Sequence, residues 1–199
     1  MTGADVAAIT AIVAGMFCVV LIGILHFVEP EYDPSWRMIS EYSLGSHGWL
    51  MRVGFIAMAV SPAAIGIALW PFGGAWTVGL AIVAAGAIGA AFVDADSIMT
   101  PRAAATRVGR AHTVLGSVLL IGFPVAALMA GLGSADGLGW TLALASALPW
   151  ATLLWFLRVS SSAHGQGGSP AVRVGWPDRA CLVAYLAWVV LAAAAVLSS

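Results

Sequence analysis

His112 is the residue of this sequence that is best placed to do chemistry, because it stands about one turn inside a long apolar segment. Gly109 and Gly116 lie three residues before and four residues after it, so the helical face that carries the imidazole is otherwise small. Asp94 ends the preceding apolar segment on a face of small residues, which in membrane helices marks close helix contact. We therefore expect both side chains to point inward, either as an acid–base pair or as a structural hydrogen bond between two helices.

A polar loop supplies the other candidates. Residues 29–49 read EPEYDPSWRMISEYSLGSHGW, and their prolines and turn residues predict a folded loop. Ser40 is a candidate nucleophile or hydrogen-bond donor, and arginines are suited to hold phosphate with two hydrogen bonds. The loop should fold back over the next two helix ends and bring these residues towards His112. The predicted catalytic residues are His112, Asp94 and Ser40, and the predicted ligand-binding residues are Asp33, Arg37, Glu41, His47, Asp96, Arg107 and Arg110.

Two cofactor alternatives stay open at this point. His26 and His112 each have a glycine three residues earlier, an arrangement that would allow axial bis-histidine ligation of a b-type haem. A zinc ion would take His112, His47, Asp33 and Asp94. The sequence contains no H-x-x-x-H or H-E-x-x-H spacing, so we assign no metal ligands and leave the cofactor unknown.

The elements that must position these residues are membrane helices. Hydrophobic residues make up 61% of the chain and charged residues only 9%, with no lysine, which is typical of integral membrane proteins. A span needs roughly 20 apolar residues. The expected fold is all-α, a six-helix transmembrane bundle in one domain over residues 1–199, with helices at about 5–28, 49–70, 75–95, 107–131, 138–158 and 179–198. A net charge of −1 and dispersed arginines argue against nucleic-acid binding.

The order of these features resembles the DUF998 family of six-helix membrane proteins. The segments that carry the resemblance are the loop quoted above, FVDADSIMTP at residues 92–101 and GRAHTVLG at residues 109–116. The family pattern would map onto Asp33, Ser40, Leu44, Gly45, Asp94 or Asp96, Gly109, Arg110 and His112. FVDADS lacks the spacing and the proline of the family's F-x-x-D-P setting, so the choice between Asp94 and Asp96 stays open. The pattern is also distantly similar to the Frag1/DRAM/Sfk1 group, whose members are linked to membrane lipids.

Three function classes remain. The first is a protein that binds or processes a lipid head group in a polar pocket at one membrane face, with or without turnover. The second is a non-catalytic accessory subunit that docks a membrane-protein partner through the same end. The third is the b-type haem electron carrier. The partner that we expect is therefore a membrane lipid or another membrane protein.

The arginines predict the orientation in the cell membrane. All eight lie in or beside the loops that follow the first, third and fifth expected helices. By the positive-inside rule these loops are cytoplasmic and both termini lie outside. A reporter that is active only after export should therefore be active when fused to the C-terminus and inactive when inserted within residues 159–178. The reverse pattern would refute this orientation and would place the polar loops on the outer surface.

Overall fold

The computed structural model describes residues 1–134, 136–161 and 169–199. Its α-helices are α1 (Gly3–Val28), α2 (Gly48–Gly73), α3 (Val78–Phe92), α4 (Arg107–Gly133), α5 (Asp136–Ala145), α6 (Ala147–Ser161) and α7 (Gly175–Leu197). Three 3₁₀ turns connect them, η1 (Ile39–Leu44), η2 (Gly74–Thr77) and η3 (Arg102–Ala104). The described residues contain no strand. The prediction of an all-α fold is confirmed.

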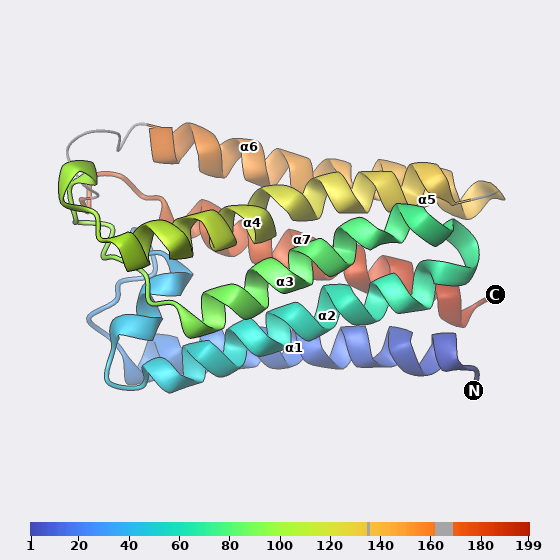
Figure 1. Ribbon diagram of the computed structural model, residues 1–199, viewed down its shortest axis with the longest axis horizontal. Coiled ribbons are helices and arrows are strands. Elements are labelled where there is room, and N and C mark those ends of the chain that lie inside the picture. Colours follow the sequence, from blue (N-terminus) through green and yellow to red (C-terminus); the bar gives the residue numbers. More distant parts are fainter. Residues whose placement is uncertain (135, 162–168) are drawn as a thin grey trace.

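Within the described residues, five helical stretches are long and apolar enough to cross a membrane: Gly3–Val28, Gly48–Phe92, Arg107–Gly133, Leu138–Ser161 and Gly175–Leu197. The second stretch has 45 residues and turns back at η2, so α2 and α3 run antiparallel (Figure 1). The fourth stretch combines α5 with α6. The chain is therefore a multi-pass helical bundle, as its composition predicts.

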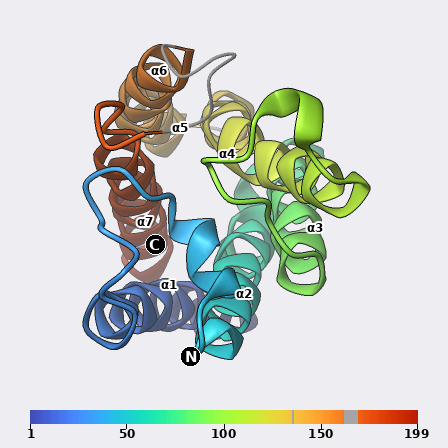
Figure 2. The same ribbon diagram turned by 90° about the vertical axis from the view of Figure 1, so that its left-hand side faces the viewer.

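The polar loops gather at one end of this bundle (Figure 1). Residues 29–47, residues 93–106 and the start of α7 lie at this end, which we call the polar end, while both chain termini lie at the other. Figure 2 looks onto the polar end and shows the loop of residues 29–47 crossing from α1 past α7 to η1. Residues 162–168 of the third connection lie outside the described part of the chain.

Three helix boundaries differ from the sequence prediction. The third helix ends at Phe92 rather than near residue 95, so Asp94 follows the helix instead of closing it. The fifth expected helix is interrupted at Ser146, because Pro149 lacks the N–H that a continuous helix would bond to the carbonyl of residue 145. The last helix begins at Gly175, four residues earlier than expected, because Pro177 fits within a first helical turn.

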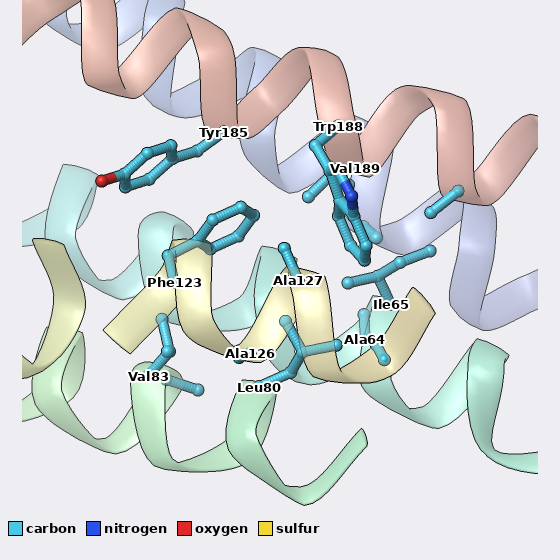
Figure 3. Close-up of a cluster of buried hydrophobic side chains, with 14 of the residues drawn as sticks. Ala64, Ile65, Leu80, Val83, Phe123, Ala126, Ala127, Tyr185, Trp188 and Val189 are labelled. Atoms are coloured by element: carbon cyan, nitrogen blue, oxygen red, sulfur yellow. The ribbon is translucent and has the colours of Figure 1, made fainter. Parts of the chain in front are cut away.

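The centre of the bundle is held by aromatic side chains from α4 and α7 (Figure 3). Phe123 stacks on Tyr185 with ring centroids 4.4 Å apart, and Trp188 meets Phe123 edge-on at 5.8 Å. The indole of Trp188 donates a 3.0 Å hydrogen bond to the carbonyl of Leu142, so its polar atom is satisfied inside the bundle. This cluster fixes α4 against α7 near the middle of both helices, away from the polar end.

Candidate functional site

Glu41 organises the polar end. Its side chain is 1% exposed, and its two carboxylate oxygens accept bonds from four donors. Arg37 Nη1 lies at 2.6 Å, the backbone N–H groups of Met38 and Ile98 at 2.9 Å each, and Ser97 Oγ at 3.2 Å. These bonds join η1 to the segment that follows α3. The loop therefore folds back over the bundle, as the sequence predicts for Arg37 and Glu41.

Arg37 completes this network from the other side. The guanidinium lies over the rings of Trp36 and Tyr32, 4.6 and 5.2 Å from their centroids, and also donates to Ser97 Oγ at 2.9 Å. A guanidinium held between a carboxylate, a hydroxyl and two aromatic faces is committed to the protein's own structure.

Arg179 is a buried cation and is held by neutral partners. Its Nε donates to His26 Nε2 at 3.0 Å, and its terminal nitrogens donate to the carbonyls of Arg37 and Gly175 and to the hydroxyl of Tyr42 at 2.9 to 3.1 Å. Burial raises the pKa of Tyr42, so this hydroxyl stays protonated and donates in turn to the carbonyl of Tyr32. Among the described residues no carboxylate oxygen lies within 4.0 Å of Arg179.

Glu29 forms a separate buried cluster at the start of α2. The carboxylate is fully buried and accepts bonds from Ser46 Oγ at 3.0 Å, from the ring of His47 at 2.9 Å and from the His47 backbone N–H. Gly45 makes room, because a Cβ there would lie 2.4 Å from Glu29 Oε2. Burial acts to raise the pKa of Glu29, but the bonds from His47 and Ser46 outweigh it and hold the pKa at about 2.

His112 lies on α4 and is 6% exposed, so it points inward as predicted. Its Nδ1 lies 2.6 Å from the carbonyl of Val93, and its ring meets Phe55 edge-on at 5.7 Å. The partner on the preceding segment is therefore a backbone carbonyl. No hydrogen bond from another described residue reaches His112 Nε2.

The expectation that Asp94 points inward is wrong. Its side chain is 53% exposed and pairs with Arg52, which is 47% exposed, at 2.8 Å. Because α3 ends at Phe92, the chain is extended at Val93 and turns the aspartate outward. Asp94 therefore lies apart from His112 and from the interior of the bundle.

Asp96 is the aspartate that approaches the start of α4. Its carboxylate accepts bonds from the backbone N–H and the hydroxyl of Thr106, each at 2.8 Å, and Thr106 caps the helix by accepting from Gly109 N–H. A Cβ at position 109 would lie 2.1 Å from Asp96 Cγ, so this position needs glycine. Arg107 and Arg110 are exposed, and Arg110 donates to the carbonyl of Ala105.

A cavity of about 390 Å³, the central cavity, extends from the polar end into the bundle. Its polar lining includes Ser40, Asp96, Ser97, Thr100, His112, Thr113 and Asp178. Its deeper lining includes Gly15, Pro62, Gly116, Phe123, Leu186 and Val189. The cavity therefore has charged and polar groups at one end and a mainly apolar interior with a few hydroxyl groups, among them those of Ser61 and Tyr185.

The central cavity brings together three of the predicted site residues, Ser40, Asp96 and His112. Arg37 and Glu41 lie above it in the network that joins η1 to residues 97 and 98. Asp33 is exposed, and the hydrogen bond from its neighbour Ser35 N–H lowers its pKa. The remaining predicted residues, Asp94, His47, Arg107 and Arg110, do not line the cavity.

Two buried charges of α7 belong to this region and were not predicted as site residues. Asp178 lines the central cavity and accepts a 2.7 Å bond from Ile39 N–H, while Arg179 holds the loop as described above. The available signal was the pair of opposite charges directly before an apolar span, since charges at such positions require partners.

The haem and metal alternatives can be compared with this geometry. Both ring nitrogens of His26 are engaged, Nδ1 with the carbonyl of Ile22 at 2.5 Å and Nε2 with Arg179. Iron ligation would require the Arg179 bond to be lost, so this side chain does not fit an axial ligand as it stands. Within the described ranges no group of three or more His, Cys, Asp or Glu side chains is placed to hold a metal ion.

Two arginine–carboxylate pairs of the polar end predict unequal losses of stability. Replacing Glu41 by Gln leaves Arg37, which is only 14% exposed, without its counter-charge, so we expect the free energy of unfolding to fall by about 3 to 5 kcal/mol. Asp94→Asn breaks an exposed pair and should cost less than about 1 kcal/mol. Unfolding of both variants in the same detergent would measure the difference. Equal losses would show that the Glu41 network does not organise this end.

Glu29 predicts a dependence of stability on pH. Its pKa in the folded protein is about 2, below the ordinary value of 4.5, so the ionised carboxylate stabilises the fold above pH 4.5. This stabilisation is lost as the pH falls from 4.5 towards 2. Between pH 4.5 and 2, the midpoint temperature of thermal unfolding should fall more steeply for the natural protein than for Glu29→Gln. Parallel curves would contradict the assignment, since both proteins share all other carboxylates.

Comparison with known proteins confirms the family that the sequence features indicate. A family model described as a protein of unknown function, DUF998, matches residues 12–195, which include the polar loop, Asp96, His112 and Asp178. No curated protein and no solved structure matches the chain. Because the match covers nearly the whole bundle, the chain belongs to the DUF998 family.

Proposed function

We propose that this protein binds a membrane amphiphile in the central cavity, with the polar head at the polar end and the hydrocarbon tail inside the bundle. The observation that carries the proposal is the change of lining along one cavity. Polar side chains such as Asp96 and His112 give way to apolar ones such as Phe123 and Val189. An amphiphile has the same order of polarity along its length.

The depth of the cavity supports a lipid-like ligand. Asp178 and Val189 both line it and are eleven residues apart on α7, which is about 16 Å of helix. Half of a hydrocarbon core of roughly 30 Å is about the same length. The cavity therefore extends about as far as one leaflet. Its volume of about 390 Å³ also falls in the range that is usual for ligand pockets.

The polar loop supports binding by covering the head-group end. Ile39 and Ser40 of η1 line the cavity, and the Glu41 network directly beside them ties η1 to Ser97 and Ile98. A head group under this cover would be shielded from bulk water, so its hydrogen bonds to the protein would face less competition.

Binding is better supported than nucleophilic catalysis. Ser40 and His112 line the same cavity, but no hydrogen bond joins them in the described structure. A serine nucleophile needs a base within hydrogen-bonding reach to become reactive. Ser40, His112 and Asp96 are therefore proposed as head-group contacts.

Filling the cavity tests this function. Gly116 lines the cavity, and a Cβ at this position would meet no atom within 4 Å. A phenyl ring in Gly116→Phe would occupy space that the tail needs, so the amount of co-purified amphiphile should fall at least about tenfold. Native mass spectrometry of protein extracted in mild detergent would measure this amount.

Gly23→Phe is the matched control. Gly23 also lies in a membrane helix with open space around its Cβ, but it does not line the cavity. This variant should keep the natural content of bound amphiphile. If the natural protein carries no amphiphile, or if Gly116→Phe carries as much as Gly23→Phe, the binding proposal fails and the accessory-subunit hypothesis gains.

A further inference from the structure

The polar lining of the central cavity offers hydrogen-bond acceptors. Asp96 and Asp178 contribute carboxylates, and neither forms an ion pair with a described Arg or His. His112 is nine-tenths buried and its Nδ1 faces the carbonyl of Val93, so Nδ1 carries the hydrogen. In the neutral ring Nε2 is then an acceptor. It has no hydrogen-bond partner among the described residues, and its side chain lines the cavity.

Several hydroxyl groups of the lining present lone pairs because they already donate their hydrogen within the protein. Ser97 donates its hydrogen to Glu41, Thr113 to the carbonyl of Gly109, and Ser117 to the carbonyl of Thr113. Deeper in the cavity, Ser61 donates to the carbonyl of Ala11 and Tyr185 to that of Leu120. Thr113, Ser117, Ser61 and Tyr185 have each used their one hydrogen, so they can only accept from a ligand. Ser97 Oγ also accepts from Arg37 and from Met99 N–H, so its lone pairs are already engaged. Ser40 and Thr100 line the cavity too, and among the described residues their hydroxyls form no hydrogen bond, so each keeps a hydrogen.

Among the described residues, no arginine contributes to the lining of the central cavity. The partly buried Arg37 and the buried Arg179 are engaged elsewhere. Arg37 binds Glu41 and Ser97, and Arg179 binds His26, Tyr42 and backbone carbonyls. A phosphate head in the cavity would therefore meet carboxylates and lone pairs without a guanidinium to hold it.

We infer that the central cavity selects an amphiphile whose head group donates hydrogen bonds and carries no negative charge, a hydroxyl or an ammonium head. This inference rests on the proposed amphiphile binding and names the class of ligand. The chemistry shared by the two heads is an O–H or N–H directed at His112 Nε2 and at the carboxylates of Asp96 and Asp178. An ammonium head would gain further from the negative charge of the carboxylates.

Three amphiphiles with the same hexadecyl chain test the inference on the full-length protein. Hexadecylglycerol carries hydroxyls, hexadecylamine carries an ammonium, and hexadecyl phosphate carries an anion. Titration of delipidated protein should show that at least one donor head binds ten or more times more tightly than the phosphate. Tighter binding of the amine than of the glycerol ether would identify the carboxylates as the main contacts, and the reverse would identify hydrogen bonding. The inference would be overturned if hexadecyl phosphate bound as tightly as both hexadecylglycerol and hexadecylamine.

His112→Asn separates the role of this residue in binding from its role in structure. The asparagine amide can still donate to the carbonyl of Val93, as Nδ1 does, but it removes the acceptor at Nε2. The variant should fold and bind the preferred donor head at least tenfold more weakly. Unchanged affinity in a folded variant would remove His112 from the site.

The outcomes distinguish this inference from the proposed function. If hexadecyl phosphate binds best, and Gly116→Phe abolishes that binding while Gly23→Phe does not, the cavity binds amphiphiles and only the head-group inference is wrong. If none of the three ligands binds, and Gly116→Phe co-purifies with as much amphiphile as Gly23→Phe, then the proposed function and the head-group inference are both wrong.

Discussion

The burial of one carboxylate, that of Glu41, determines how the polar end is built. Removing a carboxylate from water costs several kcal/mol unless it is paired and fully hydrogen-bonded. Glu41 meets this requirement only because Arg37, Ser97 and two backbone N–H groups converge on it. These donors come from the residues directly before η1 and from the segment after α3, so satisfying the charge also fixes the loop over the bundle. The position of Ser40 over the cavity and the position of Asp96 beside α4 follow from this constraint.

Two glycines on one face of α4 show how small residues serve different purposes. Gly109 is needed because the carboxylate of Asp96 occupies the space where a side chain would stand. Gly116 borders open space, since a Cβ there would meet nothing within 4 Å. The first glycine allows a helix start to be capped tightly, and the second leaves room in the central cavity. The sequence alone shows the same spacing around His112 but does not distinguish the two roles.

The membrane helices were predictable because the cost of placing polar groups in hydrocarbon affects every residue of a span. That rule gives long apolar segments, and it places all but one of their ends within three residues of the observed ones. It fails at the start of α7, where Asp178 and Arg179 have the composition of a loop. Their burial depends on Ile39 N–H and His26, which lie more than 130 residues away in the chain. No local pattern reports such partners.

The hydrogen-bond partner of His112 could not be predicted from the sequence. A carboxylate partner was expected because carboxylates can be recognised in a sequence, whereas the observed partner is the carbonyl of Val93. This carbonyl directly follows the last residue of α3, where backbone acceptors lack a helical donor. By satisfying that acceptor through Nδ1, the ring joins α3 to α4 and fixes its own orientation. The other nitrogen is then held in place without a described partner, beside the cavity. A side chain that is anchored by one atom and open at another can both stabilise the fold and contact a ligand.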